Sequence, residues 1–443
     1  MVWLGMFVVV LALLVLRQSL VLVLAVATAY IHVFVVGGKV EYLIQDFWFT
    51  ADREVLLSIP LFMLAGNVMS RGSIARRLVD FMNALTSPIP GGLAVAVVLS
   101  CAAFAAINGS SIVTMLAIGS IMYPALTASG YSQRFSVGVI ASAGTLGIII
   151  PPSIPLILYG IITDVNIAQL FVAGIGPGLL LMLMFAAYSF WVNRRMPRVA
   201  FSAAVVLRAT SGGILAILLP FIMIGGIYSG RFSPTEAGAV ALAYALLIEF
   251  FVHADADAKP LPSGAGLAQR ARHYLATREM NLRTLAQVIL ETSRLLAILL
   301  PLLCIAGSLN NILDQSGAPK QLVQYLLGTI QSPWLIMVGI NLLLLVVGCL
   351  MDVGSAILIF APLLKPLAQS VGVNPVHFGI IMISNLEIGY LTPPVGLNLI
   401  VAMAAFKVSF GTVVRSVLPF IAIMLVWLVL VIVYPAISLS LVK

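Results

Sequence analysis

The sequence predicts an all-α polytopic membrane protein with an internal repeat. Of its 443 residues, 62% are hydrophobic and only 9% are charged, whereas soluble domains carry roughly 25% charged residues. A helix needs about 20 apolar residues to cross the hydrocarbon core, so the apolar stretches allow about ten to twelve passes or half-passes. Two of these stretches contain a proline pair, Pro151-Pro152 and Pro393-Pro394. An interior proline removes a backbone hydrogen bond and clashes with the preceding turn, so each pair predicts a broken helix.

Charge and motifs exclude several classes of function. The net charge of +8 would suggest nucleic-acid binding in a soluble chain, but in a membrane protein it indicates basic cytoplasmic loops. The three cysteines lie in apolar runs without paired or metal-ligand spacing, so we interpret them as packing residues. The sequence has no strand-embedded P-loop, GxSxG elbow or HExxH helix. We therefore expect no enzymatic activity and no ATP hydrolysis, so any work that the protein performs would draw its energy from an ion gradient or another subunit.

The two proline pairs belong to a longer self-similarity. An offset of 242 residues carries Pro151 onto Pro393 and brings further identities without a gap. Several of them are glycine or proline, which constrain the backbone rather than merely fill the membrane. We divide the chain into a first repeat over residues 1–209 and a second over 210–443, with a hydrophilic connector at about 254–284; the alternative is two independently kinked helices. The other matching pairs are Leu116 and Leu358, Pro124 and Pro366, Gly130 and Gly372, Ser142 and Ser384, and Gly147 and Gly389.

Each repeat is predicted to contain a hairpin followed by a broken helix. The hairpins, at about 91–128 and 333–370, are interrupted midway by polar and small residues at 107–111 and 351–355. Polar residues at that depth favour a re-entrant hairpin, which enters and leaves the membrane on one side. The alternative is a helix–loop–helix crossing whose turn reaches the far surface. The broken helices follow at about 132–162 and 375–405.

The distribution of basic residues among the loops predicts how the chain is oriented in the membrane. Lys and Arg concentrate in cytoplasmic loops, and one set of loops carries most of them here. If the first hairpin enters from the cytoplasm, these loops share one side, the second hairpin enters from outside, and the two repeats are inverted with both termini outside. Charge alone does not separate a hairpin from a double crossing, because the two ends of either share a side. The basic residues of these loops are Arg71, Arg76, Arg77, Arg134, Arg194, Arg195, Arg198 and those between Arg270 and Arg283.

Polar residues at the interruptions are the ligand candidates. Broken helices expose backbone carbonyls for hard cations and amide N–H groups for anions. The offset places Ser110 on Asp352, so each hairpin tip has a counterpart. The alternative for a single membrane Ser or Thr is a bond to its own helix, and for Asp352 it is a cap on the helix that starts near Val353. Glu387, beside the second break, is a functional candidate by depth, unless it pairs with a basic residue or faces a wet interface.

Four segments in order resemble the large membrane subunit of tripartite ATP-independent periplasmic (TRAP) transporters of the dicarboxylate and sialate type. The resemblance covers essentially the whole chain, and the fourth segment is the most specific. The segments are Pro60-Leu61-Phe62-Met63-Leu64-Ala65-Gly66, Asn108-Gly109-Ser110-Ser111, the break from Gly147 to Ser153, and the run from Asn385 to Leu399 that contains Gly389-Tyr390-Leu391-Thr392-Pro393-Pro394-Val395-Gly396.

The resemblance implies an inverted-repeat, elevator-type transporter that imports an organic acid across the bacterial inner membrane. Sodium ions would be the coupling ions, with no other cofactor. A periplasmic substrate-binding protein would deliver the ligand, and a small four-helix membrane subunit would brace the scaffold as a separate chain, because no such segment is fused to the N-terminus. The rival hypotheses are a stand-alone sodium–dicarboxylate symporter, which needs no binding protein, and a channel or scaffold, which shows no stoichiometric sodium coupling.

The family's sites fall on the tips and breaks of this chain, and the substrate would sit between the two tips. The second tip departs from the expected pattern, because no hydroxyl or proline follows Asp352 directly. The sodium candidates are Asn108, Ser110, Ser111, Thr145, Gly147 and Pro151 in the first half and Asp352, Ser355, Gly389, Thr392 and Pro393 in the second. The substrate candidates are Ser111, Ser153, Ser384, Asn385 and Asn398.

Overall fold

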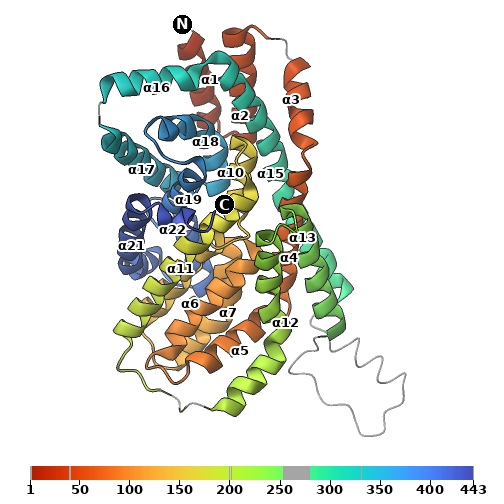
Figure 1. Ribbon diagram of the computed structural model, residues 1–443, viewed down its shortest axis with the longest axis vertical. Helices are drawn as coiled ribbons and strands as arrows, with labels where there is room; N and C mark the ends of the chain where they lie inside the picture. Colours follow the sequence, from red (N-terminus) through yellow and green to blue (C-terminus); the bar gives the residue numbers. More distant parts are fainter. Residues whose placement is uncertain are drawn as a thin grey trace.

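The computed structural model describes residues 2–38, 41–198, 200, 202–252, 280–330 and 332–442, and all regular secondary structure within these ranges is helical (Figure 1). In this part of the chain, nine helices are long and apolar enough to cross a membrane, or ten if the bent pair α4 and α5 forms one span. This confirms the prediction of a polytopic all-α membrane protein. The predicted connector lies largely outside the described residues; its last residues, from Leu282 on, already belong to a helix.

The helices of the first half form two consecutive sets. The first set is α1 (Val2–Val15), α2 (Leu20–Ile31), η1 (His32–Val36), α3 (Glu41–Ala51), η2 (Glu54–Leu57), α4 (Ser58–Arg71) and α5 (Ile74–Thr86). The second set is α6 (Gly92–Asn108), α7 (Ser111–Ala128), α8 (Gln133–Ala143), α9 (Leu146–Ile149), α10 (Ile154–Thr163) and α11 (Ile167–Val192).

The second half also consists of two consecutive sets of helices. It starts with α12 (Ala203–Tyr228), α13 (Pro234–Leu247), η3 (Ile248–Val252), α15 (Leu282–Ser316) and α16 (Ala318–Thr329). It continues with α17 (Pro333–Leu350), α18 (Val353–Ser370), α19 (Pro375–Tyr390), α20 (Leu397–Phe406), α21 (Phe410–Val433) and α22 (Ala436–Leu439). Of these, α12 is 26 residues long and α15 is 35 residues long.

The offset of 242 residues reproduces helix boundaries as well as identities. Helices α7 and α18 begin at Ser111 and Val353 and end at Ala128 and Ser370, each pair separated by this offset. Helices α8 and α19 begin at positions related in the same way. The turn from α7 to α8 and the turn from α18 to α19 each contain a glycine with positive φ, Gly130 at +83° and Gly372 at +87°. Glycine adopts this conformation without steric cost. The corresponding sequences therefore form corresponding local structures.

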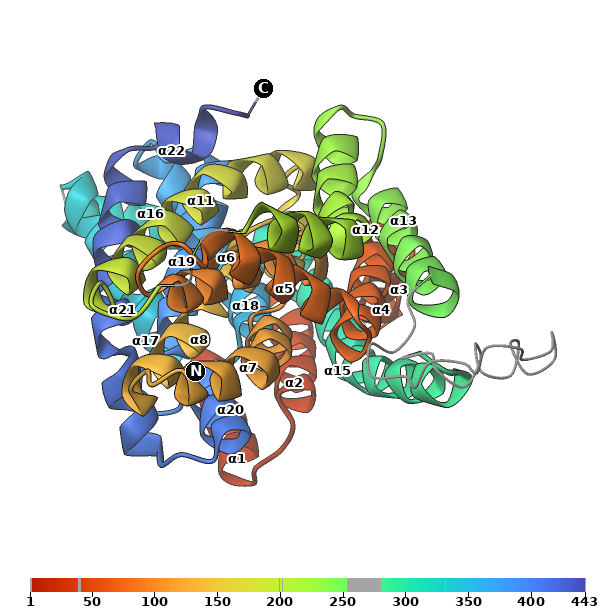
Figure 2. The same cartoon turned by 90° about the horizontal axis from the view of Figure 1, so that it is seen from below.

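The helices gather into two groups, visible side by side in Figures 1 and 2. In one group, α15 packs along α2, α3 and α4, while α13 packs against α4 and α12. In the other, the hairpins and broken helices of both halves pack together, with contacts of α17 and α18 with α19, of α10 with α18, and of α8 with α21. The second group contains all candidate site residues.

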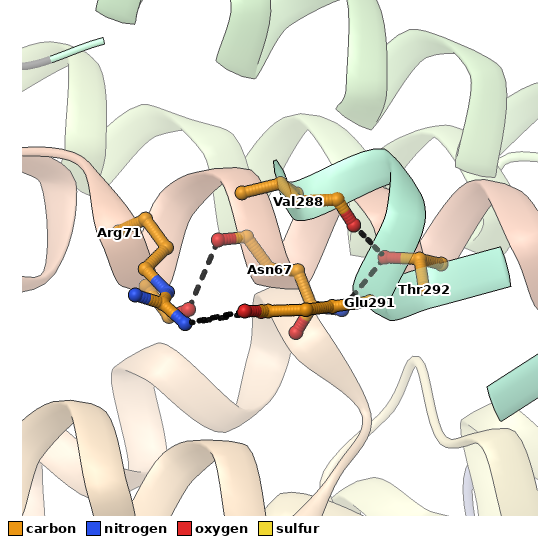
Figure 3. Close-up of polar contacts among 6 residues, drawn as sticks. Asn67, Arg71, Val288, Glu291 and Thr292 are labelled. Atoms are coloured by element: carbon orange, nitrogen blue, oxygen red, sulfur yellow. Dashed lines mark hydrogen bonds and ion pairs between the residues drawn. The ribbon is translucent and has the colours of Figure 1, made fainter. Parts of the chain in front are cut away.

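Polar contacts link α4 of the first half to α15 of the second (Figure 3). The amide of Asn67 donates to the hydroxyl of Thr292 at 2.8 Å. One turn later, Arg71 forms an ion pair with Glu291 at 2.9 Å. Because these residues lie more than 200 positions apart in sequence, the contacts join the two halves of the chain.

Candidate functional site

The first hairpin tip (residues 108–111) is a hydrogen-bonded turn between α6 and α7. The amide group of Asn108 donates to the carbonyl of Phe104 at 2.9 Å and to the hydroxyl of Thr114 at 2.9 Å. Its Oδ1 accepts from the backbone N–H of Ser110 at 2.7 Å. The side chain of Ser110 caps α7 by accepting from Val113 N. Asn108 thus holds the turn rigid while remaining almost completely buried.

The first break (residues 144–153) packs directly against the first tip. Gly147 lies so close that a Cβ there would sit 2.4 Å from the carbonyl oxygen of Ser110. The backbone N–H of Ile154, at the start of α10, donates to the carbonyl of Gly109 at 3.3 Å. Glycine at 109 and 147 is therefore required by close backbone approach as well as by the turn. The tip and the break of the first half therefore form one closely packed unit.

The second tip (residues 351–355) is built on the same plan with a carboxylate in place of a hydroxyl. Asp352 caps α18, with Oδ2 accepting from the backbone N–H of Ser355 at 2.8 Å and Oδ1 accepting from its hydroxyl. Asp352 is exposed, whereas Ser355 is buried. The helix-cap alternative for Asp352 is therefore the geometry observed, and it leaves the carboxylate accessible from outside the protein interior.

The second break (residues 389–396) packs against the end of α17 and against the second tip. A Cβ on Gly389 would lie 2.3 Å from the carbonyl carbon of Gly348 in α17. The backbone N–H of Gly396 donates to the carbonyl of Cys349 at 3.4 Å, and the N–H of Val353 donates to the hydroxyl of Tyr390 at 2.9 Å. Each half therefore brings its own tip and break together, through a glycine that permits the approach. The paired prolines of both breaks are joined by cis peptide bonds.

The two units meet at Ser111. Its hydroxyl donates to Oε1 of Glu387 at 3.0 Å and accepts from Nδ2 of Asn398 at 2.6 Å. All three side chains are buried, and the remaining oxygens of Glu387 and Asn398 have no protein hydrogen-bond partner in the described structure. Buried oxygens without partners are costly, so they are positions where a cation, a proton or a water is stabilised.

The two breaks differ in exposure. Pro151, Pro152 and Ser153 are buried, whereas Pro393 and Pro394 are exposed. Together with the exposed Asp352, this opens the second unit to the surroundings while the first unit stays enclosed. The two units are similar in backbone and different in access.

Most of the remaining candidates satisfy their polar groups locally. Thr145 donates to the carbonyl of Ser142, Ser384 to that of Ile380 and Thr392 to that of Ile388. Ser153 caps α10 by accepting from Leu156 N and donates to the carbonyl of Ile148. Asn385 donates to Asn341 Oδ1 at 2.7 Å and to the carbonyl of Ile381, with its own Oδ1 left without a partner in the described structure. These hydroxyl oxygens retain lone pairs, so local hydrogen bonds do not remove them as ligands.

Three residues of the site have no counterpart among the sequence candidates. The hydroxyl of Thr114 forms hydrogen bonds with Asn108 and with the carbonyl of Ser110. The hydroxyl of Tyr390 accepts a hydrogen bond from the backbone N–H of Val353, and Oδ1 of Asn341 accepts one from the amide of Asn385. Thr114 lies one helical turn after Ser110, a spacing that signals a shared face. The sequence carries no comparable signal for Tyr390 or Asn341, because their partners come from other helices.

The ligand chemistry of the site is that of oxygen atoms. Within the described residues, no group of three or more His, Cys, Asp or Glu side chains has the arrangement of a metal centre. The tips and breaks instead offer hydroxyl, amide and backbone carbonyl oxygens with the carboxylates of Asp352 and Glu387. Such ligands suit hard cations rather than transition metals.

Comparison with known proteins assigns the chain to a family. The family model of the DctM component of the tripartite ATP-independent periplasmic transporter matches residues 7–437. The C4-dicarboxylate TRAP transporter large permease protein DctM of Pseudomonas aeruginosa is 39% identical over 397 residues, covering 88% of this chain and 87% of that protein. The protein of the same name from Vibrio cholerae is 36% identical, with 88% and 85% covered. The 2,3-diketo-L-gulonate TRAP transporter large permease protein YiaN of Escherichia coli is 32% identical, with 84% and 83% covered.

A solved structure shares the fold at low identity. The crystal structure of the Alcanivorax borkumensis YdaH transporter aligns with a TM-score of 0.59, at 15% identity, over 90% of this chain and 89% of that one. The relatives compared above are transport permeases and not enzymes. The chain is a multi-pass membrane protein that belongs to the DctM family, the large permease component of TRAP transporters.

Proposed function

We propose that this chain imports an organic acid across the bacterial inner membrane and that a sodium gradient drives the import. A periplasmic binding protein delivers the substrate, and a separate small membrane subunit completes the transporter. The observation that carries the proposal is the pairing of each hairpin tip with the break of its own half, at Ser110 with Gly147 and at Val353 with Tyr390. Broken helices with exposed backbone ends are the usual membrane solution for binding an anion and its coupling cations together.

In this proposal the tip-and-break units are the sodium sites. The first site uses Asn108, Ser110, Thr145 and the backbone from Gly147 to Pro151. The second uses Asp352, Ser355, Thr392 and the backbone from Gly389 to Pro393. The enclosed first unit and the accessible second unit support different exchange rates for the two ions.

The substrate lies between the two tips, near Ser111 and Asn398, with Ser153, Ser384 and Asn385 in the surrounding layer. Helix α7 begins at Ser111 and α18 begins at Val353, and helix N-termini favour a carboxylate through their free N–H groups and dipole. The relatives are named for C4-dicarboxylate and for 2,3-diketo-L-gulonate, and this supports an organic acid as the substrate class. An elevator movement, in which the group of hairpins and broken helices travels relative to the other group, fits the division into two groups.

Proteoliposomes that contain this chain and its small subunit test the function. We would measure uptake of radiolabelled succinate, as a C4-dicarboxylate probe, with an imposed sodium gradient, with and without the cognate binding protein. Uptake that requires both supports the proposal. Sodium-driven uptake without the binding protein indicates a stand-alone symporter, and flux that is independent of any gradient indicates a channel.

A further inference from the structure

A cavity of about 600 Å³ lies between α5 and α12, apart from the tips and breaks. Helix α5 contributes Arg77, Asp80, Asn83 and Ser87, and α12 contributes Arg208. Its lining therefore holds two guanidinium groups and one carboxylate, a composition unlike the apolar surface of the spans. Nothing in the proposed transport site uses these residues.

Arg77 is fixed in place at the wall of the cavity. One of its terminal nitrogens donates to the carbonyl of Gly212 at 2.8 Å, and its Nε donates to the hydroxyl of Ser73 at 3.4 Å. The helices approach closely here, because a Cβ on Gly213 would lie 3.2 Å from the carbonyl oxygen of Arg77. A guanidinium carries five N–H donors, so donors of Arg77 remain for a ligand in a fixed orientation.

The charged groups of the cavity form no close ion pair with one another, although Arg76 and Arg77 lie near enough to act electrostatically on the carboxylate of Asp80. In the described part of the chain, the guanidinium of Arg208 makes no hydrogen bond or ion pair, and the carboxylate of Asp80 forms no ion pair within 4.0 Å. Two guanidinium groups complement a phosphate through charge-assisted hydrogen bonds. The carboxylate complements an ammonium group in the same ligand.

The position of the cavity favours a lipid over a soluble molecule. It lies at the start of α12, a 26-residue candidate membrane span, at the end of the molecule that also holds α5 and the end of α11 (Figure 1). Val205 in its lining is 56% exposed, and the same two helices carry exposed apolar side chains next in sequence to lining residues, Leu207 at 71% and Leu85 at 46%. Basic pockets between membrane helices bind lipid headgroups, whose chains then cover such apolar surface.

We propose that this cavity binds the headgroup of a phospholipid that carries both a phosphate and a primary ammonium group, as phosphatidylethanolamine does. Arg77 and Arg208 hold the phosphate, and Asp80 accepts hydrogen bonds from the ammonium. The acyl chains run along the exposed apolar side chains of α5 and α12. The site is independent of the proposed transport function, because it needs neither the tips nor the breaks.

Native mass spectrometry of the delipidated complex with its small subunit tests the proposal. Phosphatidylethanolamine, phosphatidylglycerol and phosphatidylcholine are titrated separately, and the apparent affinity of the first bound lipid is measured. We expect phosphatidylethanolamine to bind with higher affinity than phosphatidylcholine, because the choline group has no N–H to donate to Asp80. Arg208→Gln should weaken phosphatidylethanolamine binding about tenfold, and Asp80→Asn should abolish the preference over phosphatidylcholine.

Arg195→Gln is the matched control. Arg195 is exposed, lies on the loop just before α12 and does not line the cavity, so its loss changes the charge without changing the site. Arg208 is the decisive position because, unlike Arg77, its side chain forms no hydrogen bond to another helix in the described structure. We therefore expect its replacement to leave the fold intact. Equal lipid binding by wild type and the Arg208 variant, or equal losses at Arg208 and Arg195, would overturn the site. Displacement of the lipid by soluble phosphoethanolamine at the same concentration would overturn the lipid assignment.

Discussion

Ser111 and Glu387 lie 276 residues apart, and the hydroxyl of Ser111 donates to the buried carboxylate of Glu387 at 3.0 Å. The same hydroxyl receives the amide of Asn398. One serine at the tip of the first hairpin thus connects it to both helices of the second break. If the tips hold the coupling ions, this contact is a direct polar connection through which the occupancy of one half can affect the other.

Ser111→Ala removes this connection and leaves a carboxylate oxygen and an amide buried without partners. We expect the mutation to destabilise the folded protein by about 1–3 kcal/mol and to reduce sodium-driven uptake. Thermal unfolding of the purified complex and uptake by proteoliposomes measure the two effects. Ser120→Ala is the matched control, because Ser120 lies on the same helix, is exposed and donates only to the carbonyl of Ala117. Equal behaviour of the two variants would argue against a role for the Ser111 contact.

Asp352→Asn separates the capping role of the side chain from its charge. Asparagine is also a good helix cap, so α18 should stay folded and the melting temperature should change little. The loss of the carboxylate should raise the sodium concentration needed for half-maximal uptake. Asp52→Asn, at another exposed aspartate, is the control and should leave sodium activation unchanged. An unaltered sodium dependence in the Asp352 variant would remove this carboxylate from the second cation site.

Gly147→Ala and Gly389→Ala test the packing of each tip against its break. The added methyl group would meet the carbonyl of Ser110 at 2.4 Å in the first case and Gly348 at 2.3 Å in the second. Backbone cannot yield as a flexible side chain can, so we expect each variant to lose about 1–3 kcal/mol of stability and most of its uptake. Gly339→Ala, in α17 with no atom within 4 Å of the new Cβ, should instead be neutral or stabilising by about 0.5–1 kcal/mol. Full activity of the Gly147 and Gly389 variants would contradict close packing at these positions.

Replacement of Pro393 and Pro394 together by Ala restores the missing backbone donors of the second break. Alanine favours helix strongly over proline, so α19 should extend toward α20 and close the gap between them. We expect uptake to be suppressed in protein that is correctly inserted. Pro419→Ala, inside α21 and away from the breaks, is the control and should transport normally. Normal uptake by the double variant would show that the break is dispensable.

Much of the local structure could be predicted from the sequence. The positions at which helices are interrupted follow from proline, glycine and capping residues, whose effects act within a few bonds of the residue itself. The offset of 242 residues, read from identities alone, also relates the starts and ends of α7 and α18. Ser110 and Asp352 occupy equivalent caps because a hydroxyl and a carboxylate both accept from a backbone N–H.

The tertiary structure alone decided which side chains meet. The contacts of Ser111 with Glu387 and Asn398 join residues 276 and 287 positions apart, and the hydrogen bond of Tyr390 with Val353 joins two neighbouring helices. The burial of one proline pair but not the other likewise depends on which helices pack around it. A span surrounded by lipid and a span surrounded by protein are both apolar, so hydropathy does not reveal which faces pack together. The sequence by itself therefore determined where the helices break, and only the packing of distant helices decided which polar groups those breaks bring into contact.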